Sequence, residues 1–308
     1  MYKIFYLSHY DRSFEIVSRQ RLRIFAALII SFAFWLLASP AAIAAPRTSD
    51  AKLNSPNATK SKSNAIAKAV SLAPNGKTGM WWSRESGWGI SLTSSTDNAK
   101  LFAAFYIYDD QGVARWYTAS DCRFAGNQCT SRVEETSGSP CAASFSLGQI
   151  ARRDVGDITL NFSSSAFASM SFNISGVTRT VPIERFIFAS GSTPATDYSG
   201  VWWNPNESGN GVSITHLADT IFVAWYAFDT VGKPTWYVLT CNAAGTNSCS
   251  DTLYSANGPV LAATFDTSRV QLKNIGPATL TFSSSGNARL AYQASGQTIT
   301  KDFVRFVF

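Results

Sequence analysis

The sequence predicts an all-β protein made of two tandem antiparallel up-and-down β-barrels, each with about eight strands. The first observation is an internal match: GVWWNPNESGNGV at 200–212 nearly repeats GMWWSRESGWGI, which begins at Gly79. The match continues at a spacing of about 120 residues, too long for a solenoid repeat, and therefore indicates a duplicated domain. The second is that each copy alternates short runs of Val, Ile, Thr and aromatic residues with turn residues, without helical periodicity.

Residues 1–44 are predicted to be an export signal. Three arginines between positions 19 and 23 precede an apolar run that ends in small residues, with Ala42-Ile43-Ala44 in the arrangement of a cleavage site. The apolar run is close to spanning length, so a retained membrane anchor is the alternative. We expect cleavage after Ala44, which makes the mature protein periplasmic or secreted in a Gram-negative bacterium. Any membrane contact is then only through the uncleaved signal.

Residues 45–78 are predicted to be a disordered linker, because they are rich in Ser, Asn, Lys and Ala and lack aromatic residues. This region and the signal also carry the basic excess of the chain. The formal net charge is +6, yet residues 79–308 hold fifteen basic and seventeen acidic side chains. The basic isoelectric point is therefore no argument for a nucleic-acid partner, and none is expected.

The two copies span residues 79–188 and 200–308, and ASGSTPATDYS at 189–199 joins them. In the second copy, GVSITHLADT, IFVAWYAFDT and PTWYVLTC predict strands, separated by turn residues such as those between Asp229 and Pro234. ATLTFSSSGNARLAYQASGQTIT adds two strands, and KDFVRFVF closes the unit. Short connections make neighbouring strands antiparallel, and closure into a barrel removes the exposed edges.

One strand of the second copy, within residues 221–228, is apolar on both of its alternating faces, which burial on one side does not require. Its two faces hold Ile221, Val223 and Trp225 on one side and Phe222, Tyr226 and Phe228 on the other. One set is expected to fill the barrel, and the other to pack on the sister domain or on a partner.

Four cysteines are predicted to form one local disulfide in each copy, because they fall at matching positions across short polar loops of an exported chain. The pairs are Cys122 with Cys129 and Cys241 with Cys249. A metal site needs more ligands than the mature chain offers, with His216 as its only histidine, so no metal and no cofactor is predicted. Cys141 has no counterpart, and is either a buried apolar thiol or a reactive one.

The pattern Gly-x-Trp-Trp followed by Glu-Ser-Gly-x-Gly, an aromatic strand ending in Asp, a Gly turn and Trp-Tyr resembles a tandem repeat of exported proteobacterial proteins, most of them functionally uncharacterised. The resemblance covers nearly all of both copies. The first copy departs from the second at Ser83 and Arg84, where the second has Asn204, Pro205 and Asn206. The two copies therefore share no role that depends on these residues.

A weaker resemblance is to the calycin group, which includes lipocalins and avidins. Those barrels open with Gly-x-Trp and place an Arg of the last strand against that Trp. The corresponding pairs here are Trp81 with Arg185 and Trp202 with Arg305. A guanidinium stacked on an indole at the seam gains about 1–2 kcal/mol when desolvated, and ties the first strand to the last. The resemblance implies calycin-like barrels that these pairs close.

Glu85 and Glu207 are the repeated carboxylates near the tryptophans, and a hydrolase that uses them as general acid or base is the alternative function. Glycosidases need two facing carboxylates, whereas each copy offers one. We therefore expect each Glu to accept backbone N–H bonds in its Gly turn or to pair with an Arg. Ser86 and Ser208 lack a histidine in the first copy that would activate a nucleophile.

Aromatic side chains remain as the candidates for ligand binding. In a doublet such as Trp81-Trp82 the two rings point to opposite faces of a strand, and the outward ring is either a platform or a domain contact. The candidate ligand-binding residues are Trp82, Glu85, Trp88, Trp203, Glu207, Trp236 and Tyr237. We predict an exported non-catalytic binding or cell-envelope interaction protein that holds a small apolar molecule, a glycan or an envelope protein.

A third possibility is an outer-membrane protein in which both copies form one larger barrel. The closing residues FVRFVF alternate apolar positions and end in Phe, as such barrels often do. The first copy also ends in RFIF, but inside the chain and before a polar linker, which argues against it.

Overall fold

The computed structural model describes residues 76–308, apart from 85–86, 141–144, 261–264 and 295. The predicted signal, most of the predicted linker, Glu85, Ser86 and Cys141 lie outside the described residues. Apart from these gaps, both copies are described.

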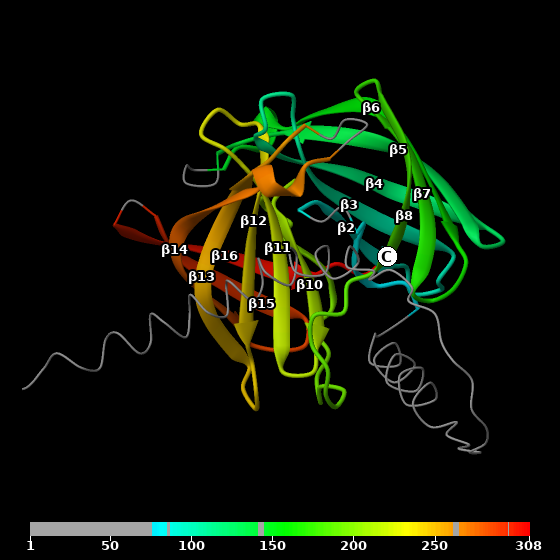
Figure 1. Ribbon diagram of the computed structural model, residues 1–308. Helices are drawn as coiled ribbons and strands as arrows, with labels where there is room; N and C mark the ends of the chain where they lie inside the picture. The colour runs from blue at the N-terminus through cyan, green and yellow to red at the C-terminus, as the bar shows by residue number, and fades with distance from the viewer. Residues whose placement is uncertain (1–75, 85–86, 141–144, 261–264, 295) are drawn as a thin grey trace, which may run out of the picture. The chain divides into compact units, whose positions relative to one another are not determined.

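The first copy forms a closed antiparallel barrel, barrel 1, whose eight strands follow one another in sequence order (Figure 1). Its strands are β1 (Gly79–Trp82), β2 (Gly89–Ser94), β3 (Lys100–Tyr108), β4 (Ala114–Ala125), β5 (Gln128–Ser137), β6 (Ala151–Phe162), β7 (Phe167–Ile174) and β8 (Val177–Arg185). A short 3-10 helix, η1 (Leu147–Gln149), precedes β6. The barrel closes where β1 pairs with β8, with Trp81 opposite Arg185.

The second copy repeats this topology as barrel 2. Its strands are β9 (Gly200–Trp203), β10 (Gly211–Leu217), β11 (Thr220–Phe228), β12 (Pro234–Asn242), β13 (Ser248–Asn257), β14 (Gln271–Phe282), β15 (Asn287–Ala294) and β16 (Gln297–Arg305), with η2 (Thr267–Arg269) before β14. Pairing of β16 with β9 sets Arg305 opposite Trp202. The predicted fold of two tandem eight-stranded barrels is thus confirmed, whereas the single larger barrel is wrong because each sheet closes on itself.

The two faces of β11 are used differently. Ile221, Val223 and Trp225 lie in the hydrophobic core of barrel 2. The opposite face turns to barrel 1, where the Trp116 ring lies 5.7 Å from the rings of both Tyr226 and Phe228. A strand buried on both sides explains why the sequence here is continuously apolar rather than alternating.

The contact between the barrels is reciprocal. Trp116 donates from Nε1 to the carbonyl oxygen of Ala227 at 2.7 Å, and its counterpart Trp236 donates to the carbonyl oxygen of Ile107 at 3.0 Å. The turns repeat the exchange, since Gly138 N donates to Gly232 O at 2.9 Å and Gly258 N donates to Gly112 O at 3.0 Å. Such two-way exchange between equivalent residues is the mark of an isologous interface, here within one chain.

The glycines of the repeated Glu-Ser-Gly turn are explained by packing and backbone conformation. Gly87 and Gly209 both have φ of +83°, a region that residues with a side chain rarely adopt. A Cβ on Gly87 would lie 2.6 Å from Cγ2 of Val270 in the other barrel. A Cβ on Gly209 would lie 2.7 Å from the Phe228 ring and 3.3 Å from Cγ2 of Thr136 in barrel 1. This part of the motif therefore serves the barrel interface.

Each copy holds one disulfide, as predicted. Cys122 bonds to Cys129 and Cys241 bonds to Cys249, with Cα–Cα distances of 5.2 and 5.5 Å. Each bond joins the fourth strand of a barrel to the fifth near their hairpin. Disulfides are typical of proteins that fold outside the reducing cytoplasm.

Replacing both Cys241 and Cys249 by serine is expected to lower the free energy of unfolding by about 2–3 kcal/mol, because the lost crosslink closes a short loop. Urea unfolding followed by circular dichroism measures the change. The wild-type protein unfolded with and without reductant is the control, and should show the loss of both disulfides. An unchanged urea midpoint in the double variant would contradict the prediction.

Candidate functional site

The Trp–Arg pairs lie at the seams of the barrels. Trp81 and Trp202 are fully buried, with 0% of their surface exposed. The guanidinium carbon of Arg185 is 5.1 Å from the centre of the Trp81 ring, and that of Arg305 is 5.0 Å from the centre of the Trp202 ring. Each pair combines a cation–π contact with a strand pairing, so these four residues help to close the barrels.

The end of each barrel beside its Trp–Arg pair is closed by a residue that the sequence interpretation missed. Trp81 donates from Nε1 to the carbonyl oxygen of Lys77, and Trp202 donates to that of Tyr198, both at 3.0 Å. The Lys77 ammonium lies 4.3 Å from the centre of the Phe162 ring, and Tyr198 stacks on the equivalent phenylalanine, Phe282. The sequence could have indicated these two residues by their matching positions, because each stands two positions before the first glycine of its repeat.

The outward tryptophans of the two doublets are not free platforms. Trp82 packs edge-on against Phe186 at 5.3 Å, and Trp203 packs against Phe306 at 5.5 Å. Both tryptophans are half-buried. They cover the chain that follows the last strand of their own barrel.

The remaining aromatic candidates lie in three different places, with Trp88 and Trp236 buried and Tyr237 half-buried. Trp236 lies between the barrels, through the bond to Ile107 given above. Tyr237 lies inside barrel 2, with its ring 5.0 Å from that of Trp225. Trp88 lies inside barrel 1, 6.4 Å from Phe172, and its Nε1 has no hydrogen-bond partner among the described residues. The structure therefore does not bring these residues together into one site.

Glu207 belongs to a polar network inside the mouth of barrel 2. Lys301 donates from Nζ to its two carboxylate oxygens at 3.0 and 2.9 Å, and Asn210 donates from Nδ2 at 2.6 Å. Trp225 in turn donates from Nε1 to the side-chain oxygen of Asn210 at 2.7 Å. The pair is sheltered, because the side chains of Lys301 and Glu207 are 7% and 18% exposed. The sequence predicted a backbone N–H or an Arg as the partner of Glu207. The side-chain partners in the structure are Lys301 and Asn210 instead.

This network is specific to the second copy. The positions of Lys301, Asn210 and Trp225 correspond to Val181, Trp88 and Phe105 in the first. The sequence could have indicated this network through Lys301, a lysine at an inward position of the last strand. Sequence comparison between the copies shows the difference, but only the structure shows that the three residues meet.

The mouth of barrel 1 contains a cavity of about 560 Å³. It lies at the end of the barrel where β3, β5 and β7 end, the same end as the Glu-Ser-Gly turn. Tyr117, Phe172 and Ile174 supply apolar lining residues, and Pro234 reaches the cavity from the second copy. The reciprocal packing of the barrels therefore makes one wall of this cavity out of barrel 2.

Charged side chains line the same cavity and hold one another in place. Arg115 lies between Asp109, at 2.9 Å, and Asp229 of the other copy, at 3.5 Å. Arg153 donates to Glu135 from Nε at 3.2 Å and from Nη2 at 2.6 Å. The equivalents of Arg115, Glu135 and Arg153 in the second copy are Thr235, Ser255 and Lys273, so this charged rim belongs to barrel 1.

The Tyr117 side chain stands at the boundary between the apolar surface and the charged rim. Burial raises the pKa of its hydroxyl to about 12, and the nearby Glu135 adds to the rise. The phenol is therefore protonated at neutral pH and offers a hydrogen-bond donor. No hydrogen bond from this hydroxyl is made within the described part of the chain.

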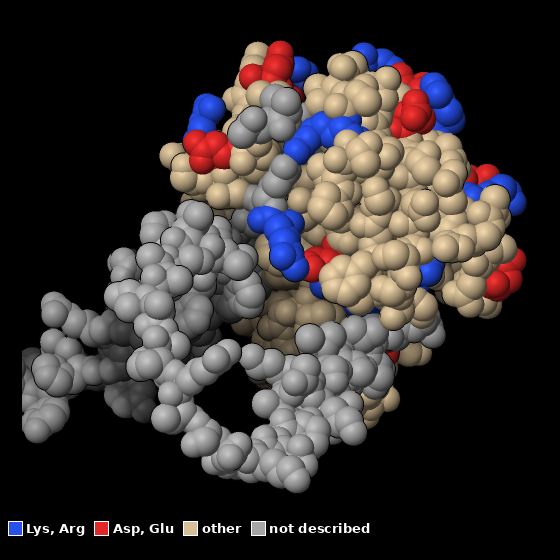
Figure 2. Space-filling model, turned by 45° about the vertical axis from the view of Figure 1, so that its right-hand side comes forward, with Lys and Arg blue, Asp and Glu red and all other residues tan. Residues whose placement is uncertain are grey.

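Outside the cavity of barrel 1, the charged side chains include several local ion pairs. Figure 2 shows blue and red residues side by side on the face that it draws, with tan residues over much of the remainder. Among the described residues, Arg132 pairs with Asp154 and Arg289 with Asp302, both at 2.6 Å. Within residues 76–308, outside the gaps, no group of three or more His, Cys, Asp or Glu side chains could hold a metal ion.

Among the residues that the structure describes, no helix has the length and apolar character needed to cross a membrane. No protein-family model matches the chain, and a search of curated proteins finds no match.

Proposed function

We propose that this chain is an exported, non-catalytic binding protein that holds a small polar ligand with an apolar face, such as a sugar, in the mouth of barrel 1. The observation that carries the proposal is the cavity of about 560 Å³ that joins an aromatic surface to a rim of paired charges. Its volume lies within the usual range of small-molecule sites.

The chemistry of the cavity suits a sugar better than a purely apolar molecule. The aromatic rings of Tyr117 and Phe172 offer apolar surface to the C–H face of a pyranose. The guanidinium of Arg153 and the carboxylate of Glu135 offer planar donors and acceptors to its hydroxyls. Because these charges already pair with each other, a neutral ligand can join the network without leaving a charge uncompensated.

The second copy then acts as support. Its Glu207 carboxylate is occupied by Lys301 and Asn210, and so we propose no hydrolytic role for it. Its turn contributes Lys233 and Pro234 to the cavity of barrel 1. The two disulfides support export, and we propose a periplasmic or secreted location.

The test is a calorimetric titration of the purified exported chain with a panel of neutral mono- and oligosaccharides, small hydrophobes and lipids. We expect saturable binding of one class of neutral sugar. Tyr117→Phe should weaken it about threefold to tenfold, because it removes one hydrogen bond while keeping the ring. Tyr117→Ala should weaken it by more than about tenfold, because the stacking surface is lost as well.

The matched control is Tyr237→Phe, which makes the same change at the equivalent position of the second copy. Its affinity should equal that of the wild-type protein. A wild-type protein that binds no sugar, or equal losses in Tyr117→Phe and Tyr237→Phe, would remove the proposal.

A further inference from the structure

A second hollow lies between the barrels at the opposite end from the mouth of barrel 1. Here the chain after the last strand of one barrel meets the second and third strands of the other. On one side, Phe186 and Phe188 pack against Phe222 of barrel 2, at 6.3 and 5.9 Å. Gly191 of the inter-repeat segment also lies there, so close to Ala218 that a Cβ on it would be 2.8 Å from the alanine Cβ. This side is filled.

The equivalent place on the other side is not filled in the same way. Phe306 and Phe308 stack on each other at 5.3 Å, and no ring contact within the described residues joins either of them to Phe102, the counterpart of Phe222. Phe308 is held instead through its main-chain oxygen, which accepts from the backbone N–H of Thr96 at 2.9 Å and from the Thr96 hydroxyl at 3.3 Å. A groove of about 340 Å³ remains, enclosed by residues of both copies.

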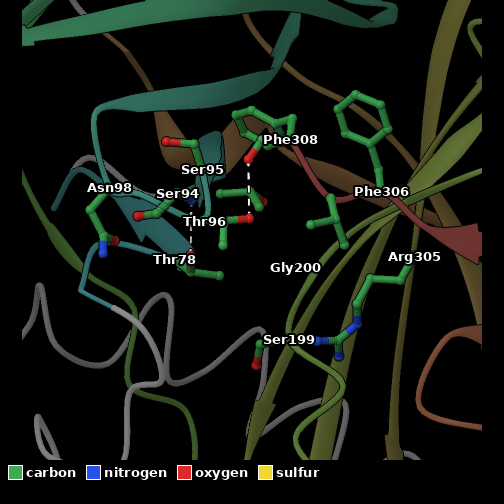
Figure 3. A pocket seen from close by; sticks show the side chains of 12 residues that line it. Thr78, Ser94, Ser95, Thr96, Asn98, Ser199, Gly200, Arg305, Phe306 and Phe308 are labelled. Carbon is green, nitrogen blue, oxygen red and sulfur yellow. Dashed lines mark hydrogen bonds between the residues drawn. The ribbon is translucent and has the colours of Figure 1, made fainter.

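The groove is lined by hydroxyl groups and one cation. Figure 3 shows Thr78, Ser94 and Thr96 from the first copy on one side, and Ser199 and Arg305 from the second on the other. The hydroxyl of Thr78 accepts from the backbone N–H of Ser94 at 3.0 Å, and that of Ser199 accepts from the N–H of His216 at 2.9 Å. A hydroxyl that accepts a bond still has its own proton to donate.

Arg305 has donors to spare, in contrast to its counterpart. Arg185 makes three bonds to carbonyl oxygens, those of Gly76, Thr78 and Ser165. Arg305 makes one, from Nη2 to the carbonyl oxygen of Asp197 at 2.6 Å, and its buried Nε has no partner among the described residues. The arginine at the seam therefore makes three hydrogen bonds in the first copy and one in the second copy, where it lines the groove.

The charges around Arg305 are few. Burial lowers the pKa of Arg305, and Asp197 and Tyr198 act in the opposite direction. The Asp197 carboxylate accepts from the backbone N–H of Ser199 at 2.8 Å, which engages one of its oxygens. Lys100 lies over the Phe308 ring at 5.5 Å, but its ammonium also pairs with Asp121 at 3.7 Å, so Arg305 is the cation among the residues that line the groove.

From this arrangement we propose that the groove binds an oxyanion, the phosphate or carboxylate group of a larger ligand. Arg305 supplies the charge, and the hydroxyls of Thr78, Ser94 and Ser199 supply neutral donors around it. An oxyanion accepts several hydrogen bonds at once, which matches a lining of convergent donors. The site does not depend on the cavity in barrel 1, because the two share no lining residue.

The test is calorimetric titration of the full exported chain with inorganic phosphate and with acetate, at constant ionic strength set by chloride. Ser94→Asp places a like charge in the groove at a half-buried position, and should weaken binding of the preferred anion at least tenfold. Ser250→Asp adds the same charge at an exposed position of barrel 2 and should leave the affinity unchanged. Arg305→Lys keeps the charge but loses the planar donors, and should weaken binding about tenfold.

A sedimentation assay separates the sources of the anion. Vesicles of phosphatidylglycerol that pellet the wild-type protein, but not Ser94→Asp, would assign the site to a lipid headgroup, whereas binding of inorganic phosphate without pelleting would assign it to a soluble ligand. Thermal unfolding of Ser94→Asp shows that the variant is folded. The proposal is overturned if neither anion nor vesicle binds, or if Ser94→Asp and Ser250→Asp bind equally well.

Discussion

Trp202→Ala is expected to lower the free energy of unfolding by about 3–5 kcal/mol, as is usual when a fully buried tryptophan is truncated. Trp202 has no exposed surface and contacts the Phe282 ring at 5.6 Å inside barrel 2. Truncation leaves a cavity, removes the bond to the carbonyl oxygen of Tyr198 and takes away the surface under Arg305. The variant therefore loses stability both from the cavity in the core and from the missing Trp–Arg contact that closes the barrel.

Urea unfolding followed by far-ultraviolet circular dichroism measures the loss for Trp202→Ala. The matched control is Trp203→Ala, one residue further along the same strand, where the ring is half-buried and packs on Phe306. We expect the control to lose less than about half as much, because less apolar surface is involved. An equal loss of unfolding free energy in the two variants would show that the Trp–Arg contact at the seam adds nothing to stability.

Lys301→Met is expected to destabilise the protein by about 3 kcal/mol, because it leaves Glu207 in a sheltered position with its charge uncompensated. The value is taken at the low end of the range for buried pairs, since the Glu207 side chain is 18% exposed and keeps its bond to Asn210. The first copy has Val181 at the position of Lys301, so the fold itself does not require a lysine there.

The companion variants complete a double-mutant cycle. Glu207→Gln alone strands the ammonium of Lys301, whereas Glu207→Gln combined with Lys301→Met removes both charges and should recover at least half of the loss. Equal and additive losses would mean that the two residues do not depend on each other. The cycle is read from urea midpoints at one pH, so that the protonation of other groups is unchanged.

The fold could be predicted from the sequence because the patterns that indicate it lie within single strands and turns and occur in both copies. Two apolar faces in residues 221–228 indicated burial on both sides, and β11 uses one face for its barrel and the other for the interface. The matching cysteines indicated the two disulfides. The alternation of residues along a strand decides to which face each side chain points, so these features can be predicted from the local sequence alone.

The candidate sites were harder to predict from the sequence, because a site depends on which residues of distant strands come into contact. Nothing local to Trp236 shows that its N–H reaches the carbonyl oxygen of Ile107, 129 positions away. The pairing of Glu207 with Lys301 spans 94 positions and has no counterpart in the first copy. Comparing the copies at each position, rather than seeking what they share, would have drawn attention to Lys301, Arg115 and Glu135.

The reciprocal contact between the barrels has a consequence for how the protein can vary. Two separate subunits with such an interface would come apart on dilution, but a covalent link keeps their effective concentration constant, typically in the millimolar range for short linkers. Each half can therefore change its own interior without being matched by its partner. One half has acquired a charged rim at Arg115 and Arg153, and the other an internal ion pair at Lys301. Fusion thus permits a division of labour that a symmetric pair of identical subunits cannot have.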